Sequence, residues 1–175
     1  YGDDHWTGRA CELLREVFET DCQVYFVFTG SAANALGLAT VCRSYHAILC
    51  HEAAHVENDE CGGAEFFSGG AKVRYLPGKD GRLTPAAIEA AAAKRTDLRY
   101  PKTRALSITQ STELGTVYTP AQLKDVCRVT RKHGLKVHMD GARFSNAVAN
   151  LGVKPKEITW KAGVDMLSFG LTKNG

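Results

Sequence analysis

The residue types that could do chemistry in this sequence gather in four short segments. The first is Thr29-Gly30-Ser31, where free backbone N–H groups at the start of a helix, with a hydroxyl beside them, would suit a phosphate group. The same residues also fit a plain strand-to-helix turn capped by a side chain. The sequence contains neither GxxxxGK(S/T) nor GxGxxG, so the common nucleotide-binding motifs are absent.

The second segment, residues 51–55, reads His-Glu-Ala-Ala-His and matches HExxH, the pattern of zinc peptidases. That chemistry needs both histidines on one face of a helix, with Glu52 as the base. A strand-like apolar run precedes the motif and a Gly-rich acidic stretch follows it closely, which leaves little room for such a helix. Three interpretations stay open: a zinc site with a later ligand such as Glu89, histidines without a function at a strand end or surface, and a cofactor-facing His55.

The last two segments supply an acid, an arginine and a lysine. Asp140 ends a predicted strand, where a carboxylate can pair with a ring nitrogen and keep it protonated. Arg143 can hold a carboxylate bidentately, or it can pair with Asp140 itself. Lys173 follows another predicted strand, and a lysine in that place can form a Schiff base. A lone lysine is usually a solvated surface residue, but together the four segments contain the parts that a pyridoxal phosphate site needs.

The elements that must position these residues alternate between helices and strands. Helices are expected at about residues 5–20, 32–43, 85–94, 120–133, 144–151 and 155–162, and strands at 24–28, 46–50, 72–76, 104–109, 135–139 and 164–169. Residues 57–70, which are rich in Gly and acids, are expected to form a loop that includes one helical turn. This alternation predicts an α/β domain with a mostly parallel sheet, whose ligands bind at the carboxyl ends of the strands.

Composition excludes several other classes of protein. The chain has 175 residues, of which 44% are hydrophobic and 23% charged, so disordered and fibrous classes are excluded. A net charge of +3 with interspersed signs argues against nucleic acid as a partner, and no apolar run approaches the ~20 residues of a membrane helix. No signal peptide is visible. The six cysteines form no CxxC pair and lie mostly in apolar surroundings, so we expect free, buried thiols and a cytoplasmic protein.

From Tyr1 to Lys173 the sequence resembles the low-specificity L-threonine aldolases of the β-eliminating lyase family, which are fold-type I pyridoxal-phosphate enzymes. The resemblance rests on four segments in order: residues 29–34, residues 54–55 with Glu60 and residues 62–64, residues 138–143 with 146–147, and residues 165–168 with 172–173. It implies a three-layer αβα fold like the large domain of aspartate aminotransferase.

The resemblance also implies how pyridoxal 5'-phosphate would be held. Gly30 and Ser31 would bind the cofactor phosphate, and His55 would stack on the pyridine ring and help with proton transfer. Asp140 would pair with the pyridine nitrogen, and Lys173 would carry the Schiff base to the cofactor. Under this interpretation the match to HExxH is accidental and no metal is expected.

On the substrate side, the resemblance places Arg143 near the phenolic oxygen of the cofactor and the substrate carboxylate. The implied reaction is retro-aldol cleavage of L-threonine, L-allo-threonine or related β-hydroxy-α-amino acids to glycine and an aldehyde. Many members carry a histidine near the substrate hydroxyl in the loop that here spans residues 109–115, and this loop has none. The candidates for the general base are therefore His55, an ordered water and Glu113, in that order.

Other activities stay open beside this one. A sister pyridoxal-phosphate activity (β-elimination, phenylserine cleavage or racemisation) would use the same parts, while a zinc peptidase or a non-catalytic α/β binding module would not. Chains of the family are longer and have a small C-terminal domain, so residues 1–175 are expected to form the central part of the cofactor-binding large domain, without that small domain. By resemblance alone, we expect a homodimer or homotetramer with the active site at the dimer interface.

Overall fold

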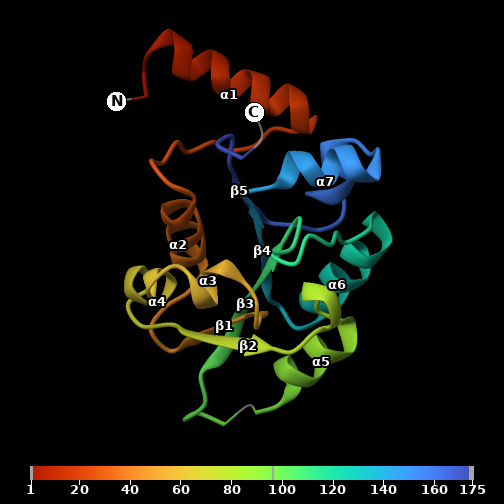
Figure 1. The fold of residues 1–175 in the computed structure, drawn as a ribbon. Coiled ribbons are helices and arrows are strands. Elements are labelled where there is room, and N and C mark those ends of the chain that lie inside the picture. The colour runs from red at the N-terminus through yellow and green to blue at the C-terminus, as the bar shows by residue number, and fades with distance from the viewer. Residues whose placement is uncertain (1, 96, 174–175) are drawn as a thin grey trace.

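A five-stranded parallel sheet forms the centre of the protein, in a computed structural model that describes residues 2–95 and 97–173. Its strands are β1 (His46–His51), β2 (Lys72–Leu76), β3 (Lys102–Thr109), β4 (Lys136–Gly141) and β5 (Met166–Phe169). They lie in the order β2-β1-β3-β4-β5, and every neighbouring pair is parallel (Figure 1). The carboxyl ends of all five strands therefore lie along one edge of the sheet.

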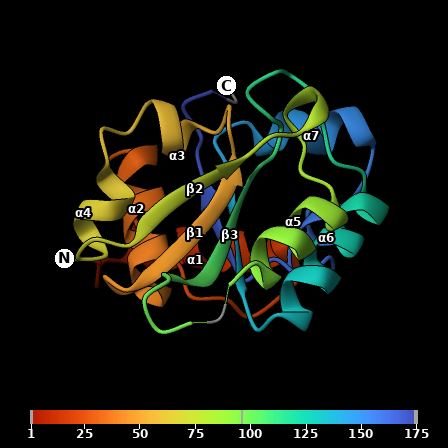
Figure 2. The same cartoon turned by 90° about the horizontal axis from the view of Figure 1, so that it is seen from below.

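Helices cover both faces of this sheet. They are α1 (His5–Phe18), α2 (Gly30–Val41), α3 (His55–Asn58), α4 (Gly63–Phe67), α5 (Pro85–Ala93), α6 (Pro120–Lys132) and α7 (Phe144–Leu151), with short 3-10 helices η1 (Lys79–Gly81) and η2 (Pro155–Ile158). Helices α2, α3 and α4 lie on one face, and α5, α6 and α7 on the other (Figures 1 and 2). The three-layer αβα fold expected from the sequence is confirmed.

The two faces of the sheet carry separate apolar cores, because successive side chains of a strand point to opposite faces. In β1, Ile48 and Cys50 pack with Leu38 of α2 on one face. Leu49, between them, packs on the other face with residues of α5 and α6 such as Ile88. A strand buried on both faces has a continuous run of apolar residues, which is why β1 was recognisable in the sequence.

The strand expected at residues 24–28 is wrong. This segment connects α1 to α2 without forming a strand, and Tyr25 and Phe28 are 82% and 92% exposed. A strand needs a neighbour that pairs with its N–H and C=O groups. Among residues 2–95 and 97–173, no strand pairs with this segment, so its high β-propensity is not realised.

The loop expected at residues 57–70 is more ordered than the sequence indicated. It contains the end of α3 and the whole of α4, joined by a turn in which Cys61 and Gly62 adopt positive φ angles of 50° and 71°. The turn places Glu60 in the interior, where its side chain is 1% exposed.

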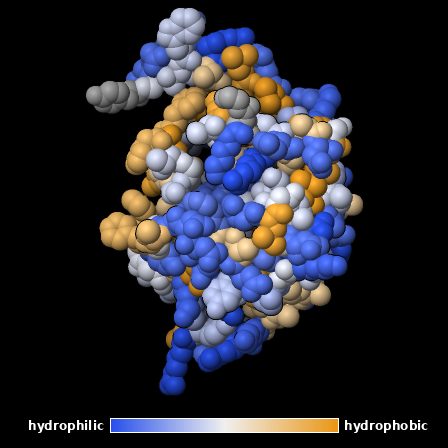
Figure 3. Space-filling model, in the orientation of Figure 1, coloured by the Kyte–Doolittle hydropathy of each residue, from blue (hydrophilic) through white to orange (hydrophobic). Residues whose placement is uncertain are grey.

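Helix α1 joins the rest of the protein at its C-terminal end. The indole nitrogen of Trp160 donates a hydrogen bond of 2.8 Å to the backbone oxygen of Phe18, and Lys154 pairs with Glu19. The rest of the helix extends along the top of the molecule in Figure 1 and exposes Leu13 and Val17. Apolar surface, orange in Figure 3, is accordingly visible along this helix.

All six cysteines are free thiols, as expected, but only three of them are buried: Cys11 and Cys22 are partly exposed and Cys61 is exposed. Cys42, Cys50 and Cys127 are buried, and burial raises the pKa of their thiols to about 11, 12 and 12. These three are therefore protonated and unreactive at neutral pH.

In the part of the chain that the structure describes, no helix is both long and apolar enough to cross a membrane.

Candidate active site

Asp140 lies at the carboxyl end of β4, where it is 6% exposed. Each of its oxygens accepts a hydrogen bond. The backbone N–H of Ala142 donates to Oδ1 at 3.0 Å, and Nδ2 of Asn34 donates to Oδ2 at 2.9 Å. Two donors on different elements therefore fix the plane of this carboxylate, as expected of an acid that must face a ligand in one orientation.

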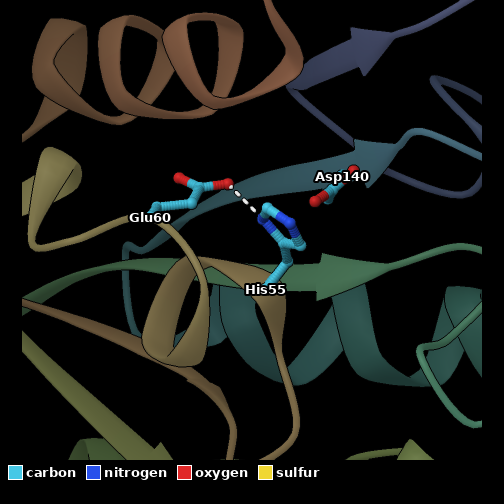
Figure 4. Close-up of side chains that lie close together, drawn as sticks. All are labelled: His55, Glu60 and Asp140. Carbon is cyan, nitrogen blue, oxygen red and sulfur yellow. Dashed lines mark hydrogen bonds and ion pairs between the residues drawn. The ribbon is translucent and has the colours of Figure 1, made fainter. Parts of the chain in front are cut away.

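Asn34 connects Asp140 to a second buried acid. Its Nδ2 also donates to Oε1 of Glu60 at 2.7 Å, so both N–H bonds of the amide are used. The same Glu60 oxygen lies 2.9 Å from Nδ1 of His55. Figure 4 shows the His55 ring between Glu60 and Asp140. Four side chains from α2, α3, β4 and the turn after α3 thus form one cluster.

This cluster has the donor set of a cation site, since ligand atoms of His55, Glu60 and Asp140 all lie within 4.8 Å of one another. However, the Asn34 amide donates to one oxygen of each carboxylate. Hydrogen bonds from a neutral group therefore already bring the two acids together, and their proximity does not require an ion.

The HExxH motif does not form the helical pair that a zinc peptidase needs. His51 is the last residue of β1, whereas His55 is the first residue of α3. Both ring nitrogens of His51 are engaged with the backbone: Nδ1 accepts from Ala53 N–H at 2.9 Å, and Nε2 lies 2.9 Å from the carbonyl oxygen of Gly78. His51 therefore supports a turn, and the zinc interpretation is wrong.

The start of α2 lies close to the cluster, because Asn34 is little more than one turn from Gly30. The Thr29 hydroxyl accepts the N–H of Ala32 and caps the helix. The first N–H groups of a helix have no partner within it, so those of Gly30 and Ser31 face outward. They can bind an anion, and the helix dipole favours one there.

Arg143 and Lys173 lie outside the hydrogen-bonded cluster. Arg143 precedes α7 and pairs with Glu113 of the loop after β3, so the expected alternative of an Asp140–Arg143 pair is not formed. Lys173 is exposed in the turn four residues after β5 ends at Phe169. Because β4 and β5 are parallel neighbours, Asp140 at the end of β4 and Lys173 after β5 lie at strand ends on the same edge of the sheet.

A buried histidine lies two residues before Asp140 on the same face of β4. His138 is 1% exposed, with Nδ1 2.9 Å from the Ser107 hydroxyl and Nε2 3.0 Å from the Ser168 hydroxyl. Burial lowers the pKa of His138 to about 4, and the nearby charge of Asp140 opposes this effect only in part. The imidazole is therefore neutral at pH 7 and joins β3, β4 and β5 through two hydroxyl groups.

The sequence interpretation gave no role to Asn34 or Glu60, although both lie in the segments that carry the resemblance. The signal in the sequence was a polar residue within the Ala- and Leu-rich run of α2. A buried amide of this kind must find hydrogen-bond partners, and here these are two acids far away in the sequence.

Comparisons with known proteins agree with this arrangement. The family model described as "Beta-eliminating lyase" matches residues 1–175. Low specificity L-threonine aldolases from Pseudomonas sp. (strain NCIMB 10558) and Pseudomonas aeruginosa are 56% and 57% identical to the chain over its whole length. The chain spans about half of these relatives, 51% of each.

A solved structure with a similar fold supports the same family. The threonine aldolase of Leishmania major is similar with a TM-score of 0.85 and 29% identity, over 90% of this chain and 46% of that one. An alanine–glyoxylate aminotransferase from Nostoc sp. shares the fold, with a TM-score of 0.67 and 21% identity over 91% of this chain and 39% of that one. With the family model matching the whole chain, this protein belongs to the β-eliminating lyase family.

Proposed function

We propose that this chain forms the cofactor-binding part of a pyridoxal-phosphate-dependent lyase. The enzyme cleaves L-threonine, L-allo-threonine or a related β-hydroxy-α-amino acid to glycine and an aldehyde. The contact of Asn34 with Asp140 carries the proposal, because it brings the anion-binding start of α2 to a buried acid at the end of β4. The names of the Pseudomonas and Leishmania relatives support the substrate class.

The residues present fit such a cofactor. Gly30 and Ser31 would bind its phosphate, and apart from its chain neighbours and its own helix backbone nothing lies within 4 Å of the place where a side chain on Gly30 would begin, which leaves room for one. Asp140 would hold a proton on the pyridine nitrogen, using the oxygens that Ala142 and Asn34 already orient. His55, whose side chain is 32% exposed, would present its ring to the pyridine.

The remaining residues would act on the substrate. Arg143 would bind the substrate carboxylate, and the amine of Lys173 would attach the cofactor and exchange it with the substrate amine. The cofactor, when bound, supplies an electron sink for the negative charge that develops on the α-carbon as the bond to the β-carbon breaks. The protein determines which bond breaks by orienting the substrate carboxylate and side chain.

A base must also take the proton of the substrate β-hydroxyl. His55 remains the first candidate, because Glu60 engages only its Nδ1 and the other ring nitrogen lies on the side of Asp140 (Figure 4). Glu113 remains the weaker candidate, because it pairs with Arg143. An ordered water keeps its place between these two candidates.

The Lys173→Ala variant tests the proposal. Incubated with pyridoxal phosphate and then with borohydride, the unaltered chain should become labelled at Lys173, as read by mass spectrometry of its peptides. Lys173→Ala should lose both the visible absorbance of the lysine adduct and the release of glycine. Lys124→Ala, which removes an exposed lysine of α6, is the matched control and should keep both. A Lys173→Ala chain that keeps both would contradict the assignment.

Product analysis separates the proposed reaction from a sister activity on the same scaffold. Glycine with an aldehyde supports the aldolase, whereas ammonia with a keto acid would indicate β-elimination. D-threonine or D-allo-threonine formed from the L substrate would indicate racemisation.

We also propose a cytoplasmic homodimer or homotetramer with the active site near the subunit interface. Free thiols at all six cysteines are consistent with a reducing compartment. Exposed aromatic residues at Phe26, Phe66 and Phe67 offer apolar surface to a partner. Light scattering of the chain after size exclusion tests the oligomeric state, and a monomer at all concentrations would contradict it.

A further inference from the structure

We propose that Glu60 and Asn34 are positioning residues. Glu60 fixes the tautomer of His55, and Asn34 joins this pair to Asp140, so that the acid and the histidine keep one relative orientation. The inference rests on the proposed function only in that His55 and Asp140 would act on the cofactor and substrate. The hydrogen bonds among Asn34, Glu60, His55 and Asp140 join protein atoms alone.

The direction of the His55–Glu60 hydrogen bond follows from the Asn34 amide. An amide placed between two acidic side chains must present its NH2 group, because its carbonyl oxygen would be repelled by theirs. Oε1 of Glu60 therefore accepts from Asn34 at 2.7 Å. The same oxygen lies 2.9 Å from Nδ1 of His55, so Nδ1 must be the donor. In the neutral ring, Nε2 is then the nitrogen with the free lone pair.

This tautomer presents the basic nitrogen to the site. Figure 4 shows the His55 ring held by Glu60 on one side, with its second nitrogen toward Asp140. Glu60 is buried whereas His55 is partly open to solvent, so a ligand can reach the ring but not the group that orients it. A buried carboxylate that orients a histidine in this way selects its tautomer and its position.

Asn34 is the only described residue that donates to both acids. It is 2% exposed, and it connects residues that are 26 and 106 positions away in the sequence. Without its NH2 group, the side chains of Glu60 and Asp140 would face each other as two buried acids with no donor between them. Such a pair of acids is destabilising. The amide holds Glu60 and Asp140 together, and because Glu60 is bonded to His55, it also determines how closely His55 and Asp140 approach.

The cluster also contains two buried acceptors without partners among residues 2–95 and 97–173. These are Oδ1 of Asn34 and Oε2 of Glu60. A buried polar atom without a partner costs stability, and a core built only for stability would contain apolar residues here. Their presence supports a role in orienting groups rather than in holding the fold.

The tautomer of His55 in the cofactor-free chain tests the role of Glu60. Two-bond 1H–15N correlation spectra of the 15N-labelled chain give the protonation of each ring nitrogen, and a His55→Gln variant assigns the signals. We expect Nδ1–H in the unaltered chain. Glu60→Gln keeps an oxygen acceptor and should retain Nδ1–H, whereas Glu60→Leu removes it and should shift the ring to the Nε2–H form. Nε2–H in the unaltered chain, or Nδ1–H in a folded Glu60→Leu chain, would overturn the proposal.

The affinity for pyridoxal phosphate tests the role of Asn34. Loss of a buried hydrogen bond to an acid corresponds to a dissociation constant about tenfold higher, so Asn34→Ala should weaken binding by this factor. Asn150→Ala, at an exposed position of α7, is the matched control and should bind like the unaltered chain. If Asn34→Ala does not fold, Asn34→Ser, which keeps one donor, replaces it and should bind with intermediate affinity.

The two readouts separate failure of this inference from failure of the proposed function. If the unaltered chain does not bind pyridoxal phosphate while its His55 shows Nδ1–H, the proposed function fails and the role of Glu60 stands. In that case the position of the His55 ring decides the role of Asn34: Asn34→Ala should keep Nδ1–H, which Glu60 holds, but shift the ring 1H and 15N signals, and signals unchanged from those of the unaltered chain overturn it. If the chain binds and Asn34→Ala binds equally well, the role of Asn34 is overturned and the proposed function stands.

Discussion

Arg143 pairs with Glu113 across the carboxyl edge of the sheet, with Nη1 3.5 Å from Oε2. Arg143 follows β4 and Glu113 follows β3, and these strands are parallel neighbours. The two side chains are 39% and 24% exposed, so solvent screens the pair and its contribution to stability is at most about 1 kcal/mol. Arg143 thus binds a carboxylate of its own chain, where the proposed function requires it to bind that of the substrate.

The Glu113→Gln variant should therefore bind amino acids more tightly. Removing the internal carboxylate frees the Arg143 guanidinium, and a pair worth at most about 1 kcal/mol limits the gain to about fivefold. Titration of the cofactor-loaded chain with glycine, followed by visible absorbance, measures the effect. Glu12→Gln, which breaks an exposed pair with Arg9 on α1, is the control and should change nothing. Weaker glycine binding in Glu113→Gln would show that Glu113 assists the substrate instead of competing with it.

Gly141 is required by the close approach of β4 to β5. A methyl group on Gly141 would lie 2.7 Å from the backbone oxygen of Ser168 and 2.7 Å from Leu167 Cδ1. The oxygen belongs to the neighbouring strand and cannot move without disturbing the pairing of Gly141 with Phe169. Gly141→Ala should therefore lower the free energy of unfolding by roughly 1–3 kcal/mol.

Urea unfolding measures this loss, and Gly8→Ala is its control. Gly8 lies inside α1, and no atom lies within 4 Å of the added methyl group. Alanine is the better helix former, so this variant should gain about 0.5–1 kcal/mol. A Gly141→Ala chain as stable as the unaltered one would show that β5 moves freely at this edge.

Most of the fold could be predicted because its elements carry their own signals. Residues 47–50 form a continuous apolar run, as expected of a strand buried on both faces, and Thr119 with Gln122 forms the capping box that begins α6. Residues 24–28 carry an equally strong β signal and form no strand. Propensity is local, whereas a strand depends on a partner elsewhere in the chain, and no strand in the described part of this chain pairs with them.

The sequence could predict only those residues of the candidate site that lie at or just after the end of a predicted strand. Asp140 was found because its strand ends there, and its role as the partner of a ring nitrogen stays a prediction, as does that of Lys173. The contact of Asn34 with Glu60 and Asp140 could not be found in this way. It depends on how α2 lies over the sheet and on the turn that directs Glu60 inward, and neither has a local pattern.

The buried His138 predicts how stability depends on pH. Its pKa is about 4 in the folded chain, against 6.5 when the group is exposed. The unfolded chain therefore binds a proton more readily, so the contribution of His138 is complete above pH 6.5 and is lost as the pH falls toward 4. The difference corresponds to about 3 kcal/mol of unfolding free energy. Urea unfolding at pH 7, 5.5 and 4.5 should show this fall, and His138→Gln, which keeps hydrogen-bonding groups but does not titrate, should show a shallower one. If the free energy of unfolding fell equally steeply with pH in the two chains, His138 would become protonated without unfolding.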